Sequence, residues 1–116
     1  MGYDIQLVDD HGEIVQVERF SEGGTQPIGG STTADISITY NYSKFFYETI
    51  DKEQGIRWIY GRRAGDCIGK LLKAVHILGL YKDEDYWKAT PGNAGYILAI
   101  LLKWAGKNKK AMFRGD

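Results

Sequence analysis

The first 42 residues are organised by an alternation of apolar and polar positions, which is the pattern of strands with one buried face. Residues 3–8 alternate, turn-forming residues follow at 9–13, and residues 14–20 alternate again, so a β-hairpin is predicted. After a glycine-rich loop at 21–33, the most regular alternation in the chain covers residues 34–42 and predicts a third strand.

The second half of the chain changes to the three- and four-residue spacing of amphipathic helices. Ser43 is a candidate N-cap for a short helix that ends before Gly55. Helical spacing returns at Ala64, and Gly79 is placed to close this second helix. Its expected buried stripe comprises Ala64, Cys67, Ile68, Leu71, Leu72, Val75 and Leu78.

A further helix has the strongest start signal in the sequence, with Thr90 as its N-cap and Pro91 at its first position. It is apolar nearly all round as far as Ala105, so we expect it to be the central helix or to lie in a subunit interface. Because so small a chain can hardly surround it, a homo-oligomer with shared pockets is expected.

Strands followed by helices predict a single α+β domain over residues 1–116. The expected architecture is a small antiparallel sheet, made of the N-terminal hairpin and the 34–42 strand, packed with two or three C-terminal helices. The longest apolar run, residues 96–102, is too short to span a bilayer. No signal sequence follows Met1, and Cys67 has no second cysteine to pair with, so a cytoplasmic location is expected.

The formal net charge is zero, but the two halves of the chain carry opposite charges. Residues 1–60 hold four Lys or Arg against ten Asp or Glu, whereas residues 61–116 hold eleven against five. Two interpretations fit this polarity equally well. Either the C-terminal half binds an anion, or the halves attract each other within the fold or between subunits.

No combination of residues selects an enzymatic mechanism. His11 and His76 lie far apart in the sequence, and neither has partners at metal-ligand spacing, so no metal is expected. Cys67 and His76 are more than two helical turns apart and cannot form a nucleophile pair. The glycine-rich loop lacks the Gly-Lys-Ser/Thr ending of a phosphate-binding loop. We therefore expect a ligand-binding protein without a cofactor rather than an enzyme.

Two aromatic and polar segments, 39–43 and 85–93, carry the densest binding chemistry. Their rings suit stacking on a base, their amides and hydroxyls suit reading its edge, and nearby arginines suit phosphate. The arginines precede the helix start at Ala64, and two interpretations are open: they converge with the helix amides on an anion, or they pair with the acidic N-terminal half. Asn93 is expected to serve the ligand without being needed for the core. The candidate ligand-binding residues are Thr39, Tyr40, Asn41, Tyr42, Arg57, Trp58, Tyr60, Arg62, Arg63, Tyr86, Trp87, Thr90 and Asn93.

Several motifs together resemble a family of small uncharacterised proteins encoded by tailed phages and prophages. They are Gly23-Gly24-Thr25, residues 38–43, residues 55–61, residues 85–94 and the final Gly115-Asp116, so that the resemblance covers residues 23–116. The chain departs from the family pattern at Lys107 to Lys110, where the family has a turn that contains proline.

The resemblance implies an intracellular phage accessory protein without catalytic activity. Small phage proteins that are dispensable for virion building often counter host defence, some by sequestering nucleotide immune signals. We expect this chain to bind such a signal, a cyclic oligonucleotide or an ADP-ribose-derived messenger, in the host cytoplasm without cleaving it. The alternatives are an inhibitor that binds a host defence protein directly, or a small structural or accessory phage protein. Neither a membrane nor a nucleic-acid polymer is expected as a partner.

Overall fold

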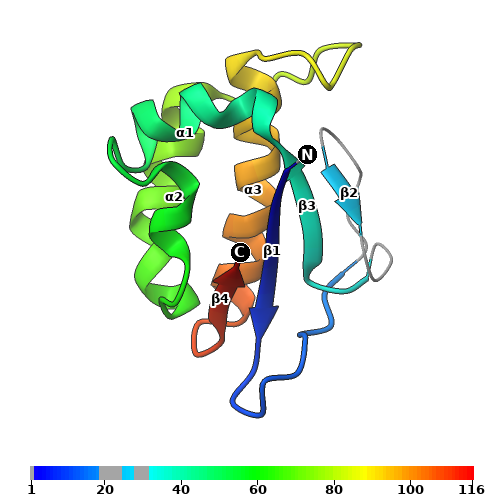
Figure 1. Ribbon diagram of the computed structural model, residues 1–116, viewed down its shortest axis with the longest axis vertical. Coiled ribbons are helices and arrows are strands. Elements are labelled where there is room, and N and C mark those ends of the chain that lie inside the picture. Colours follow the sequence, from blue (N-terminus) through cyan, green and yellow to red (C-terminus); the bar gives the residue numbers. More distant parts are fainter. Residues whose placement is uncertain (1, 19–24, 28–31) are drawn as a thin grey trace.

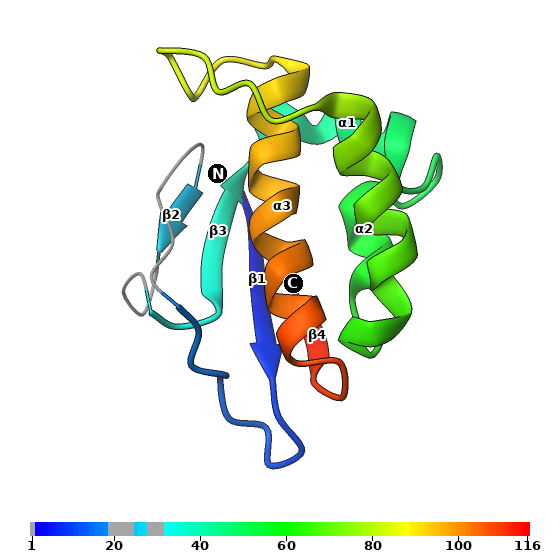
Figure 2. The same ribbon diagram turned by 180° about the vertical axis from the view of Figure 1, so that it is seen from behind.

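The structure, a computed structural model, describes residues 2–18, 25–27 and 32–116. In this part of the chain, a four-stranded antiparallel sheet with the order β2-β3-β1-β4 is covered by helices on one face (Figure 1). Figure 2 shows the covered face, with α3 lying over the sheet and α2 beside it. The predicted α+β fold is confirmed.

The central strand β1 (Gly2–Val8) lies between β3 (Asp35–Thr39) and β4 (Met112–Gly115). Ile5 of β1 lies opposite Ile36 of β3, and both side chains are fully buried. Every second residue of these two strands faces the helices, so the alternation predicted for β1 and for the first part of β3 is confirmed.

The expected N-terminal hairpin is only partly formed. Its turn closes through a hydrogen bond of 2.9 Å from the Asp9 amide to the Glu13 carbonyl. Within residues 14–18, however, only isolated bridges form, at Ile14 and Gln16. The prediction of a regular strand is wrong here because β3 and β4 occupy the two edges of β1. Residues 19–20 of that predicted strand lie outside the described residues.

The glycine-rich segment contains a short strand. β2 (Thr25–Pro27) pairs with β3, so the prediction of an uninterrupted loop over 21–33 is wrong at these three residues. The rest of this segment at 21–24 and 28–31, which includes the first two residues of the Gly-Gly-Thr motif, lies outside the described residues.

The strand predicted at 34–42 ends at Thr39, where Tyr40–Tyr42 forms a 3-10 helix. The Thr39 hydroxyl accepts a hydrogen bond of 3.2 Å from the Asn41 amide, which turns the chain away from the sheet. This turn leads directly into α1 (Ser43–Thr49). In the 3-10 helix, Tyr42 enters the core and Tyr40 remains exposed. These two side chains therefore do not share one face, as the alternation predicted for 34–42 requires.

Helix α2 (Ala64–Leu78) has the predicted bounds. Gly79 closes it with a φ of 76°, a conformation that costs glycine little and other residues more. The predicted buried stripe is wrong at Leu72, which is 55% exposed. A second 3-10 helix, Gly55–Ile59, precedes α2.

Helix α3 (Pro91–Lys107) begins as predicted, with the Thr90 hydroxyl accepting a hydrogen bond of 3.2 Å from the Asn93 amide. It lies between the sheet and α2, so most of its apolar surface is covered within one chain (Figure 2). Burial of α3 therefore needs no second subunit, and self-association stays a prediction.

The connection from α2 crosses close to the start of α3. A methyl group at Gly92 would lie 1.9 Å from the carbonyl oxygen of Tyr81, and one at Gly95 would lie 1.9 Å from that of Gly79. Glycine at these two positions lets the backbone of the connection touch the helix.

The pattern of the sequence does not predict strand β4. This strand adds the C-terminal residues to the free edge of β1 and is itself covered by residues 61–63, whose Gly61 amide donates to the Phe113 carbonyl at 2.8 Å. No helix among the described residues has both the length and the apolar character that crossing a membrane requires.

Candidate functional site

The structure brings the two predicted aromatic and polar segments together. The Asn41 side-chain amide donates a hydrogen bond of 2.8 Å to the Trp87 carbonyl, and the Tyr42 hydroxyl donates to the Tyr86 carbonyl. These bonds fasten the 85–87 turn to the end of β3. The polar groups of Asn41 and Tyr42 therefore hold the backbone of the neighbouring segment.

Asn93 has a structural role, contrary to the expectation that it is not needed for the core. Its side chain is almost fully buried, and its oxygen accepts a hydrogen bond of 2.9 Å from the Asp83 amide. Its side-chain nitrogen donates to the carbonyls of Asp85, at 3.2 Å, and Lys88, at 2.8 Å. The side-chain oxygen and nitrogen of Asn93 are thus hydrogen-bonded to the backbone of residues 83–88. The Thr90 hydroxyl is hydrogen-bonded as the helix cap.

The predicted aromatic residues divide between core and surface. Tyr42 is fully buried against Phe46 and belongs to the core. Tyr40, Tyr86 and Trp87 keep 39%, 39% and 47% of their surface exposed. These three rings are the most exposed aromatic side chains of the predicted site.

The three predicted arginines point to different places. The guanidinium of Arg57 lies 4.8 Å from the centre of the Tyr3 ring, and that of Arg62 lies 3.9 Å from the Trp58 ring. Arg63 donates a hydrogen bond of 3.1 Å to the Lys110 carbonyl. The Lys70 ammonium also lies 4.7 Å from the centre of the Trp58 ring, so two cations of the protein itself already contact this ring. The arginines do not converge on one anion.

The start of α2 does not offer free amides to an anion. The Ala64 amide donates to the Ala111 carbonyl at 2.7 Å, and the Gly65 amide donates to the Lys109 carbonyl at 2.9 Å. The loop before β4 therefore caps this helix, which corrects the expectation of an anion site here.

Tyr60 packs against the end of β4. A methyl group at Gly115 would come within 2.2 Å of its ring, and its buried hydroxyl has no hydrogen-bond partner among the described residues. Burial raises the pKa of this hydroxyl well above its ordinary value of 10.0, against the opposing effect of Arg57. Tyr60 thus packs within the protein.

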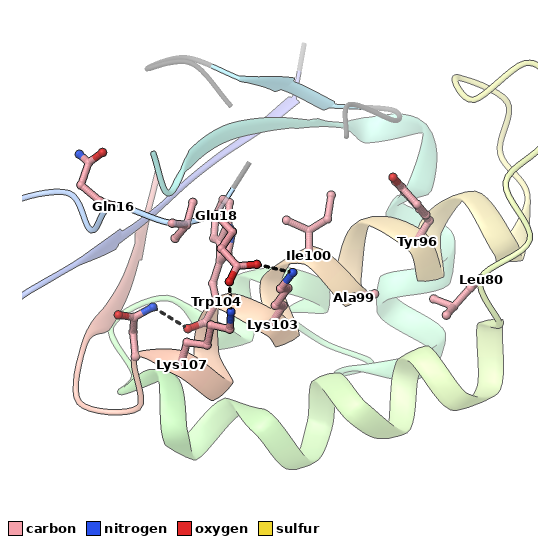
Figure 3. Close-up of a pocket in the computed structure, with 11 residues that line it drawn as sticks. Gln16, Glu18, Leu80, Tyr96, Ala99, Ile100, Lys103, Trp104 and Lys107 are labelled. Atoms are coloured by element: carbon pink, nitrogen blue, oxygen red, sulfur yellow. Dashed lines mark hydrogen bonds and ion pairs between the residues drawn. The ribbon is translucent and has the colours of Figure 1, made fainter. Parts of the chain in front are cut away.

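A groove of about 620 Å³ lies elsewhere, along α3 and beneath residues 16–18 (Figure 3). None of the predicted site residues lines it, although the structure describes all of them. Its lining residues are Gln16, Val17, Glu18, Leu80, Tyr96, Ala99, Ile100, Lys103, Trp104, Lys107 and Asn108.

Helical spacing on α3 builds the floor of this groove. Tyr96, Ile100, Lys103 and Lys107 follow one another at intervals of four, three and four residues and so share a face of the helix. Trp104 is almost fully buried beneath this face. The floor is therefore apolar and aromatic at one end and cationic at the other (Figure 3).

Glu18 lies at the cationic end. One of its carboxylate oxygens lies 3.0 Å from the Lys103 ammonium, and the other contacts the Lys107 ammonium. Hydrogen bonds from Lys107 and then Lys103, with the attraction of both charges, lower the pKa of Glu18 from 4.5 to about 2. All three side chains are more than half exposed, so their ion pairs are of the weak surface kind.

Cys67 does not line the groove. Cys67 is fully buried, and burial raises the pKa of its thiol from 9.0 to about 11, so this thiol is a poor nucleophile. Within the described residues, no three His, Cys, Asp or Glu side chains are placed to hold a metal ion.

The groove is not predicted by the sequence. The spacing of Tyr96, Ile100, Lys103 and Lys107 is visible in the sequence, but in a helix that is apolar nearly all round it predicts burial and not a groove. What makes it a groove is Glu18, more than 80 residues earlier in the chain, and no local pattern predicts that contact.

Comparisons with protein-family models, with curated proteins and with solved structures find no match to this chain.

Proposed function

We propose that this chain binds and sequesters a nucleotide-type anion in the α3 groove and releases it unchanged. The observation that carries the proposal is the groove itself, in which an apolar and aromatic floor leads to two lysines. Its volume of about 620 Å³ falls within the roughly 300–1,000 Å³ of small-molecule sites.

The chemistry of the lining assigns a role to each end. Tyr96, whose ring centre lies 4.6 Å from the Lys82 ammonium, and Ile100 offer an apolar surface for a flat base. Lys103 and Lys107 offer two ammonium groups for phosphate. The amide side chains of Gln16 and Asn108 also line the cationic end and supply donors and acceptors for a ribose or a base edge.

The biological setting that we propose is a phage-encoded protein acting against host defence in the host cytoplasm. The family resemblance of residues 23–116 supports this setting. Sequestration requires binding affinity but no chemical step. Aromatic rings, side-chain amides and lysines, which line the groove, supply such affinity. The ligand would be a cyclic oligonucleotide or an ADP-ribose-derived messenger.

A second candidate function is direct inhibition of a host protein. Ile77, in the last turn of α2, is 56% exposed, and Leu80 and Tyr81, in the connection that follows, are 54% and 82% exposed. Exposed apolar side chains grouped in this way are typical of protein interfaces. This function predicts a host protein that co-purifies at a fixed ratio, with no small molecule changing the melting temperature.

The test of the proposed function is a binding and recovery experiment. The purified protein is incubated with ADP-ribose and with a cyclic dinucleotide, bound ligand is measured by calorimetry, and the complex is denatured to recover the ligand. Sequestration predicts binding at a fixed ratio and recovery of the intact molecule. Recovery of a cleaved product would contradict sequestration and indicate an enzyme.

Matched variants test where the ligand binds. Lys103→Gln with Lys107→Gln removes both lysine charges of the groove and should weaken binding by roughly two- to thirtyfold, because exposed charge pairs contribute about 0.2–1 kcal/mol each. The control, Lys52→Gln with Lys73→Gln, removes two exposed lysines that do not line the groove. Equal losses in both pairs would indicate a general charge effect and contradict the site.

A further inference from the structure

We infer that Glu18 is an internal anion that occupies the ligand's phosphate position, so that ligands bind by displacing it. The inference rests on the proposed function of the groove, and it makes Glu18 a specificity-determining residue. The ligand class it selects is an anion with an adjoining flat apolar body.

The position of the carboxylate is the first argument. Its two oxygens divide between Lys103 and Lys107, which lie one turn apart on α3, so the carboxylate bridges both ammonium groups (Figure 3). A ligand phosphate or carboxylate bound to both lysines would have to occupy the same place. Glu18 and such a ligand therefore compete for one site.

The attachment of the segment is the second argument. The Val15 amide donates to the Leu7 carbonyl at 2.9 Å, and the Val17 amide donates to the Thr32 carbonyl at 2.9 Å. These bonds hold the backbone of residues 15–17 beside the groove. The Glu18 side chain can consequently rotate away from the lysines while its supporting backbone stays in place.

The exposure of the ion pairs is the third argument. The side chains of Glu18, Lys103 and Lys107 are 63%, 55% and 54% exposed, so water readily replaces either contact. A phosphate brings up to two charges and more acceptor oxygens than a carboxylate, and its attached base gains the apolar floor. The exchange therefore favours a phosphorylated ligand over an uncharged molecule, which contacts only the apolar floor and leaves Glu18 paired with the lysines.

A pair of fluorescent probes tests the exchange. 1-Anilinonaphthalene-8-sulfonate carries aromatic rings and an anion, whereas N-phenyl-1-naphthylamine has the same rings without the anion. Glu18→Gln should tighten binding of the sulfonate about fivefold, since two weak surface ion pairs no longer compete. Binding of the uncharged probe should be unchanged. The control Glu13→Gln removes the same charge from an exposed position outside the groove lining and should change neither probe.

The outcomes separate this inference from the proposed function. One outcome is that Tyr96→Leu weakens binding of the sulfonate, whereas Glu18→Gln binds it as tightly as the wild type does. This outcome overturns the displacement of Glu18 and leaves the groove as the binding site. A gain for both probes in Glu18→Gln would mean that Glu18 only obstructs the groove, and it too overturns the inference. If neither probe binds the wild type or Glu18→Gln, both the groove and the displacement are overturned.

Discussion

Replacing Asn93 by alanine should destabilise the protein strongly, although the residue lies in the first turn of a helix next to an exposed loop. Its side chain makes three hydrogen bonds, to the amide of Asp83 and the carbonyls of Asp85 and Lys88. At roughly 0.5–1.5 kcal/mol per bond, and with some relief because water reaches the carbonyls, we expect a loss of about 2–3 kcal/mol.

Urea unfolding measures this loss, and the melting temperature should fall by roughly 10 °C for a chain of this size. The matched control is Asn41→Ala, which removes one hydrogen bond from an exposed asparagine and should cost less than about 1 kcal/mol. If Asn93→Ala unfolds within about 0.5 kcal/mol of the wild type, Asn93 does not organise the 83–88 loop and the reasoning is refuted.

Three further predictions concern packing, reactivity and assembly. Gly95→Ala should lower the free energy of unfolding in urea by at least about 2 kcal/mol, because the added methyl group would collide with the Gly79 carbonyl. The control Gly106→Ala, which has open space around it, should be neutral or stabilising, and equal effects of the two variants would contradict the close approach. Cys67 should resist iodoacetamide at pH 8 in the folded protein and react in urea, because burial both hides its thiol and raises its pKa to about 11; rapid labelling of the folded protein would contradict this. Light scattering at micromolar concentration tests the predicted self-association, and a mass of about 13.1 kDa would contradict it.

The two long helices could be predicted from the sequence because their signals are local. Gly79 ends α2 through its positive φ, and Thr90 with Pro91 starts α3, so each boundary depends on one or two residues and their own backbone. The buried face of β1 was equally local, since it depends only on alternation.

The rest of the fold depends on contacts between distant residues. β4 has only four residues, including an arginine and a glycine, and becomes a strand because the edge of β1 is free to pair with it. The alternation at 34–42 continues past Thr39, but hydrogen bonds join Asn41 and Tyr42 to the distant 85–87 turn instead of to a neighbouring strand. Such outcomes require the tertiary structure.

The candidate site shows the same division. The sequence predicts one site from segments 39–43 and 85–93, and the structure places these segments in contact. The sequence does not tell whether the side-chain amides and hydroxyls of these segments bind a ligand or the backbone of the protein, because the same residue types make both kinds of hydrogen bond. The groove depends on Glu18 meeting α3, a contact that composition and spacing do not reveal.

The measurement that tests the central claim most directly is amide chemical-shift mapping of the ¹⁵N-labelled protein during titration with ADP-ribose and with a cyclic dinucleotide. The account predicts that saturable shifts gather at residues 16–18 and 96–108, around the groove. Shifts that gather instead at residues 40–42, 57–62 and 85–88 would place the ligand at the site predicted from the sequence and not in the groove. The absence of saturable shifts with both ligands would show that the protein binds no nucleotide-type ligand of these two kinds. Either result would contradict the account.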